Sequence, residues 1–142
     1  MTPAELRTLI ESDAQALAAA TAGDWVACAD RCGAIAPSVR VPVASADVRR
    51  EASLNSVWAT MVLAAREGSA ATPQIKGICV TFIDWIDHSP TLDFDLPQVQ
   101  AMAGGLIAAG ICTQEQYEAL FAMGNKPRSF TALECRVAVR GA

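Results

Sequence analysis

The sequence contains few of the residues and patterns on which enzyme chemistry depends. Aromatic residues make up 6% of its 142 positions, and His88 is its single histidine. The GxSxG motif of serine hydrolases, the glycine-rich phosphate loop and the HExxH zinc motif do not occur in it. His88 has no partner nucleophile in a recognisable motif, and the helix dipole alone favours a histidine at a helix C-terminus. We therefore predict a chain that is not an enzyme and binds no cofactor.

Long hydrophobic runs and a targeting leader are also missing. The longest uncharged apolar run, residues 101–112, has 12 residues and includes three glycines, whereas a membrane span needs about 20 apolar residues. The first residues lack the basic region and the apolar core of a signal peptide. We therefore expect neither membrane insertion nor secretion by a signal peptide.

The cysteines do not form the framework of a disulfide-rich protein. They are five in number, so at least one is unpaired, and all occur in apolar helical contexts: Cys28, Cys32, Cys79, Cys112 and Cys135. Free cysteine behaves as a small apolar residue in protein cores, and such usage is typical of a reducing compartment. Only Cys28 and Cys32 lie close together in the sequence, and a zinc site needs four ligands. We therefore predict no metal site.

What the sequence does contain is alanine and apolar side chains. The apolar fraction is 52%, charged residues make up 18%, and 28 residues are alanine. This composition excludes a disordered chain and favours helix over sheet. A chain of this length is close to the usual size of one domain, so we predict a single helical domain over residues 1–142.

Apolar residues recur at helical spacing along most of the chain. Capping signals predict helix starts at Thr2, Asp24, Ser45, Thr72, Asp95 or a neighbour, and Thr113, and glycines predict several of the ends, with Gly33 ending the second helix. We predict an all-α fold, a compact bundle of six or seven short helices. The spacing leaves open whether 46–67 is one helix or two. It also leaves open whether 39–43, with its alternating valines, forms a short edge strand paired with Val137 and Val139.

The net charge of −4 is unevenly distributed along the sequence. No lysine or arginine occurs between Lys76 and Lys126, while that segment contains six acidic residues; residues 126–140 carry four basic residues and one acidic residue. An acidic protein with an isoelectric point near 4.9 has no general field for nucleic acid. The two segments are either ordinary solvated surfaces or complementary patches, used within the fold or between identical subunits.

Acidic residues around one helix end are the candidate polar site. A calcium loop is not matched there, because the turn glycine and the distal glutamate are missing, so helix caps and a solvated rim are the simpler interpretation. Trp85 lies off the apolar stripe of its helix, between two aspartates, and an exposed tryptophan is a typical anchor for a protein partner; core packing is the alternative. The candidate partner-binding residues are Asp84, Trp85, Asp87, Asp93, Asp95, Lys126, Arg128, Arg136 and Arg140.

Four segments carry a resemblance to a known class of proteins. They are Leu6 to Ile10 with Ala22 to Asp24, the segment Ser56 to Trp58, the segment Asp93 to Gln100, and Leu106 to Ile111 leading to Thr113. With its helices in this order, the chain resembles small alanine-rich helical proteins encoded among the structural genes of tailed bacteriophages and prophages.

The resemblance implies a non-enzymatic virion or virion-assembly protein, located in the virion or the host cytoplasm. Its partners would be other virion or phage-encoded proteins, or further copies of itself as a homo-oligomer, and neither nucleic acid nor a membrane. The concentration of carboxylates supports an alternative function, a small acidic inhibitor or adaptor that binds one host protein.

Overall fold

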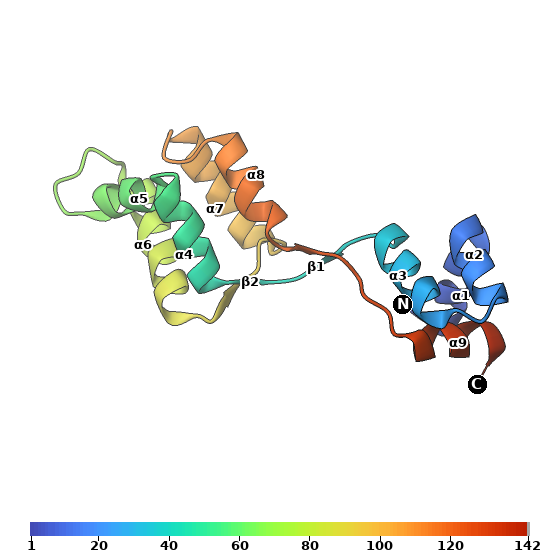
Figure 1. The fold of residues 1–142 in the computed structure, drawn as a ribbon. Helices are drawn as coiled ribbons and strands as arrows, with labels where there is room; N and C mark the ends of the chain where they lie inside the picture. The colour runs from blue at the N-terminus through green and yellow to red at the C-terminus, as the bar shows by residue number, and fades with distance from the viewer. Residues whose placement is uncertain (142) are drawn as a thin grey trace. The chain divides into compact units, whose positions relative to one another are not determined.

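The computed structural model of this protein describes residues 1–141, and 67% of the chain is helical. The described residues contain nine α-helices and two small antiparallel strand pairs (Figure 1). The predicted all-α class is confirmed. The predicted number of six or seven helices is too low, because two segments with continuous helical spacing are each divided by a local break.

The first break is at Asp13, between α1 (Pro3–Ser12) and α2 (Ala14–Thr21). The backbone of Asp13 is extended, and its carboxylate accepts a hydrogen bond from the backbone N–H of Ala16 at 3.0 Å. A side chain that accepts from the backbone in this way stabilises a helix start, so Asp13 is the N-cap of a new helix. The apolar spacing continues across the break and does not show it.

The second break answers the question left open for residues 46–67, which form parts of two helices. α4 (Ser45–Leu54) and α5 (Val57–Ala65) are separated by Ser56, which has a φ of 68°. That left-handed conformation is unusual for a residue other than glycine, and it turns the chain out of the helical path.

The capping signals predict most but not all of the helix starts. Thr2, Asp24, Thr72 and Thr113 accept hydrogen bonds from the first turns of their helices, as predicted. Ser45 is instead the first residue of α4. The N-cap of α7 (Pro97–Ala108) is Leu96, the neighbour of Asp95, and it makes no side-chain capping hydrogen bond. Gly33 lies inside α3 (Trp25–Ile35) and does not end it. Pro37 stops that helix, because a proline disfavours helical backbone in the residue before it.

The described residues divide into two compact units, each with its own core. Unit 1 comprises residues 1–39 and 126–141 and contains α1, α2, α3 and α9 (Ala132–Arg140). The terminal helix α9 packs on α1 and α3, so the two ends of the chain form one unit. Its buried side chains are Leu6, Ile10, Ala16, Ala20, Cys28, Ala29, Cys32, Cys135 and Ala138.

Unit 2 comprises residues 40–125 and contains α4, α5, α6 (Pro73–His88), α7 and α8 (Gln114–Ala122). α6 packs on α4, α5 and α7, so its apolar stripe lies at the centre of the core. The predicted single domain over residues 1–142 stays a prediction.

The sequence leaves open whether residues 39–43 form a strand, and the structure places parts of two short strands there. β2 (Val43–Ala44) pairs antiparallel with β3 (Thr91–Leu92), and β1 (Val39–Arg40) pairs with β4 (Asn125–Lys126). The predicted partners Val137 and Val139 lie in α9 instead. Thr131 and Glu134 form a capping box that starts a helix there, and the buried side chains on α9 follow helical spacing.

None of the helices in residues 1–141 has the length and apolar character that crossing a membrane requires.

Candidate functional site

Two of the predicted partner-binding aspartates lie on α6, and each has a polar side chain of unit 2 within contact distance. The carboxylate of Asp84 lies 3.0 Å from Nδ1 of His88, one turn further along the helix. Asp87 accepts a hydrogen bond from Arg49 of α4 at 3.3 Å. Asp84 and His88 are both well exposed, and contacts of this kind on a surface contribute little stability.

The other two aspartates lie in the loop before α7. Asp93 accepts a hydrogen bond from the backbone N–H of Asp95 at 2.9 Å, which shapes the turn. Asp95 pairs with Arg40 at 3.2 Å. The fold thus supplies Arg40 and Arg49 to a segment that contains no basic residue of its own, so these four carboxylates are not all free for a partner.

Trp85 is half-buried rather than fully exposed. Its ring packs edge-on against Phe82, with the ring centroids 6.1 Å apart, and it contacts the core of unit 2. Its remaining surface lines a shallow hollow together with Asp93 and Leu96. Trp85 therefore contributes both to the core and to a surface hollow, and its role as an anchor for a partner stays a prediction.

The predicted basic residues belong to unit 1. Lys126 lies on β4, and Arg128 lies in the loop before α9 with its Nε buried and without a hydrogen-bond partner among the described residues. Arg136 and Arg140 are exposed on α9, where the Arg140 guanidinium lies 5.1 Å from the ring of Trp25. That geometry is a cation–π contact, which fixes the end of α9 to α3.

The formal charge is divided between the two units in a way that the sequence order does not show. Unit 2 has nine acidic and five basic residues, whereas unit 1 has six of each. The whole charge of −4 therefore belongs to unit 2. The basic residues of 126–140 are balanced by acidic residues of the N-terminal segment 1–39, so the formal charge of unit 1 as a whole is zero.

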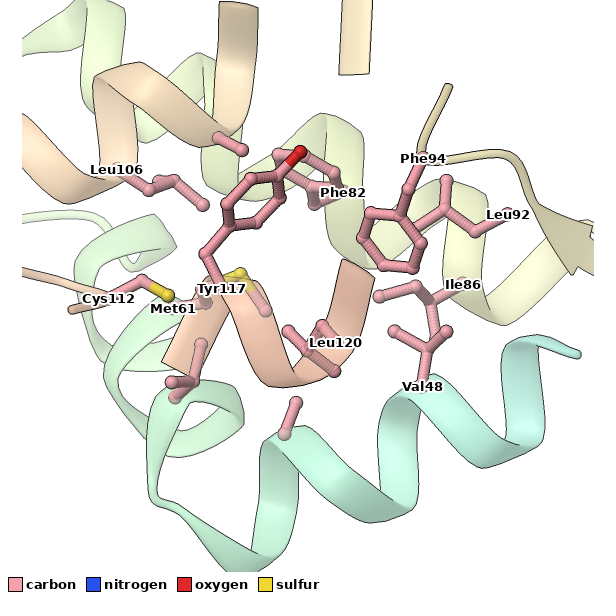
Figure 2. Close-up of a pocket in the computed structure, with 13 residues that line it drawn as sticks. Val48, Met61, Phe82, Ile86, Leu92, Phe94, Leu106, Cys112, Tyr117 and Leu120 are labelled. Carbon is pink, nitrogen blue, oxygen red and sulfur yellow. The ribbon is translucent and has the colours of Figure 1, made fainter. Parts of the chain in front are cut away.

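A small cavity of about 40 Å³ lies within the core of unit 2. Side chains of all five helices of unit 2 line it, and Figure 2 shows among them Val48 from α4, Met61 from α5, Phe82 from α6, Leu106 from α7 and Tyr117 from α8. The Tyr117 hydroxyl is buried without a hydrogen-bond partner among the described residues, and burial raises its pKa. A cavity of this size and apolar lining is a packing defect that does not hold a substrate.

Unit 1 has an apolar groove at its surface, between the start of α1 and α9. Its apolar lining comes from Met1, Leu6, Phe130, Leu133 and Val137. Leu133 is 65% exposed and Met1 is 49% exposed, so both present apolar side chains to solvent. Exposed apolar side chains that adjoin a groove are typical of surfaces that bind other proteins.

Unit 1 also contains a cluster of thiols that the sequence analysis missed. Cys28 and Cys32 of α3 and Cys135 of α9 are fully buried, and their three sulfur atoms all lie within 4.8 Å of one another. Cys135 is more than one hundred positions away in the sequence, so spacing alone does not bring it to the other two. In the sequence, only the helical spacing of Cys28 and Cys32 points to this cluster.

The electrostatics of this cluster favour neutral thiols. Burial, followed by the neighbouring thiols, raises the pKa of Cys32 to about 11 and that of Cys135 to about 12. Burial alone raises the pKa of the two cysteines of unit 2, Cys79 and Cys112. These four thiols are therefore protonated near neutral pH, and they are poor nucleophiles in that state.

Comparison with known proteins gives no relative of this chain: no protein family model, no curated protein and no solved structure matches it.

Proposed function

We propose that this protein acts through contacts with other proteins, as a non-enzymatic virion or virion-assembly component of the bacteriophage type. The observation that carries the proposal is the apolar groove of unit 1, where Leu133 and Met1 are exposed next to buried Leu6. A side chain such as Leu133 gains free energy when a partner covers it, because its apolar surface then leaves water. The resemblance of the helices to phage structural proteins supplies the class of partner.

Self-association through this groove is tested by light scattering after size-exclusion chromatography. Leu133→Asp introduces a charge into the apolar lining of the groove and is expected to shift the chain toward monomer. Leu63→Asp is the matched control, because Leu63 is 57% exposed on α5 of unit 2 and lies outside the groove. An oligomer that survives Leu133→Asp but dissociates with Leu63→Asp would contradict the role of the groove.

A second function, a small acidic inhibitor or adaptor of a host protein, is favoured by a separate observation. Unit 2 carries the whole net charge, and its hollow beside Trp85 is bordered by Asp93 and by the half-exposed Leu96. A tryptophan within an acidic surface is an arrangement that binds basic partners well.

The acidic surface is tested by pull-down from host lysate with an Asp84→Lys, Asp87→Lys variant. The control is Glu115→Lys, Glu118→Lys, which makes the same change of charge on α8 of the same unit. The adaptor function predicts that only the α6 variant loses its partner. Identical partners for all three proteins would contradict it.

A further inference from the structure

The thiol cluster of unit 1 combines three features that core packing alone does not require. Its members come from two helices that are distant in the sequence, all three are fully buried, and their sulfur atoms converge within 4.8 Å. Cys28 and Cys32 are one turn apart on α3 and therefore share a face, and Cys135 approaches that face from α9. The cysteines of unit 2 are buried to a similar extent but belong to no such group among the described residues.

The spacing of the sulfur atoms is close to what a single metal ion needs. Three thiolates bound to one ion at about 2.3 Å lie about 4 Å from one another. The observed separations therefore require an adjustment of less than about 1 Å, which side-chain rotation supplies.

We propose that Cys28, Cys32 and Cys135 bind one Cu(I) ion in a three-coordinate thiolate site that joins α3 to α9. Thiolates are soft ligands and select soft ions such as Cu(I). The ion links α3 of the N-terminal segment to α9 of the C-terminal segment, and so stabilises the packing of unit 1. This inference is independent of the partner-binding function proposed above.

The donor set argues against zinc, which is almost always bound by four ligands in structural sites. No fourth ligand, whether histidine, cysteine or carboxylate, joins the three sulfur atoms within residues 1–141. The single histidine of the chain, His88, belongs to unit 2. Among the acidic residues of unit 1, Asp13 uses both carboxylate oxygens to accept hydrogen bonds from Arg31.

Binding exchanges three S–H bonds for three S–Cu bonds. The three protons pass to the solvent, the copper stays in its +1 state, and no electron acceptor is needed. The site changes from neutral to a formal charge of −2. Cys28 and Cys135 are each the fourth residue of their helix, and the partial positive charge of a helix N-terminus favours negative charge in the first turn.

The experiment uses the reduced full-length protein without oxygen, titrated with Cu(I) in the presence of a chromophoric Cu(I) chelator. We expect one tightly bound ion per chain. Replacement of any one ligand, as in Cys135→Ala, is expected to weaken Cu(I) binding by more than about 100-fold. A loss of that size already follows when a residue that only supports a metal ligand is removed. Cys79→Ala and Cys112→Ala are the matched controls, since both remove a buried thiol of unit 2, and both are expected to bind like the parent.

X-ray absorption of the copper-loaded parent protein counts the ligands directly, whether or not a variant folds. Three sulfur neighbours at about 2.3 Å support the site. Two sulfur neighbours, equal losses in the control variants, or no binding beyond that of a variant lacking all three cysteines would overturn it. Tighter binding of Zn(II) than of Cu(I) by the parent protein would overturn the assignment of the ion.

Discussion

Arg40 connects three parts of unit 2 through one side chain. Its guanidinium pairs with Asp95, donates to the backbone carbonyl of Phe121 and to Asn125, and lies 3.7 Å from the centre of the Phe121 ring. These contacts join β1 to the loop before α7 and to the end of α8. A planar guanidinium serves such a site better than a lysine ammonium, because it donates in several fixed directions while stacking on a ring.

Replacing Arg40 by alanine is expected to lower the free energy of unfolding by about 2 kcal/mol, since charged hydrogen bonds and a stacked ring are lost together. Denaturant melts followed by circular dichroism measure this change. Arg50→Ala is the control, because Arg50 is exposed and pairs only with Asp47 on its own helix; its expected effect is within about 0.5 kcal/mol. Equal effects of the two variants would show that Arg40 has no special role.

Asp13 makes the stability of unit 1 depend on pH. Hydrogen bonds from Arg31 at 2.9 Å and from the N–H of Ala16 lower its pKa from 3.8 to about 2. Because the folded pKa lies below the ordinary value, this contribution to stability is present above about pH 4 and is lost as the pH falls toward 2.

Asp13→Asn keeps an oxygen for capping but removes the charge, so the variant is expected to be less stable than the parent at pH 6 and equally stable at pH 2. Urea melts at both pH values measure the difference. Asp24→Asn is the control, because Asp24 caps α3 in the same way without an arginine partner. A difference between Asp13→Asn and the parent that does not change with pH would contradict this origin.

These residues show what the sequence can predict about the candidate site and what it cannot. The sequence locates the acidic residues of α6 and of the loop after it, because charge is read directly. It does not show that Arg40 and Arg49 pair with them, since the partners are 55 and 38 positions away. The thiol cluster is missed for the same physical reason: long-range packing, not local spacing, brings Cys135 to α3.

At the scale of elements, the two adjacent glycines of α7 have different environments. A Cβ atom added to Gly105 would lie 2.9 Å from the terminal methyl group of Ile78 on α6, whereas one added to Gly104 meets nothing within 4 Å. The sequence alone does not distinguish them, because both glycines carry the same helix penalty of about 1 kcal/mol relative to alanine. Only packing against α6 separates their roles.

Gly104→Ala is therefore expected to raise the free energy of unfolding by about 1 kcal/mol. Gly105→Ala is expected to gain less, because the Ile78 side chain must move to accept the new methyl group. Thermal or denaturant melts of the two single variants provide the comparison, and each serves as the control for the other. A larger gain from Gly105→Ala than from Gly104→Ala would contradict the close contact between α6 and α7.

Helix positions are predicted well where both the apolar spacing and the cap agree. Thr2, Thr72 and Thr113 start helices as predicted, because a threonine that accepts from the third helical N–H is a local feature. The break at Asp13 is not predicted and the break near Ser56 is left open, since the surrounding apolar residues keep helical spacing across both.

At the scale of the whole molecule, the two units differ in how the chain builds them. Unit 2 is continuous and has its own core, whereas unit 1 needs both ends of the chain. The continuous segment 40–125 is therefore expected to fold alone, with a cooperative thermal transition and a helical spectrum.

The complementary variant, residues 1–125, lacks α9 and is expected to keep unit 2 but lose protection of the amides of 1–39 in hydrogen exchange. An unfolded 40–125 fragment would contradict the independence of unit 2, and unchanged protection of 1–39 without α9 would contradict the need of unit 1 for both ends of the chain. A single transition in the full chain would support the predicted single domain, because it would show that the units unfold together.

The proposal that this protein acts as a virion or assembly component is tested most directly by quantitative mass spectrometry of purified particles from cells that carry the gene. We predict that the chain is present at a fixed ratio to the major structural protein, either in mature particles or in assembly intermediates. A chain that is absent from both, and that is strictly monomeric in solution, would contradict the proposal.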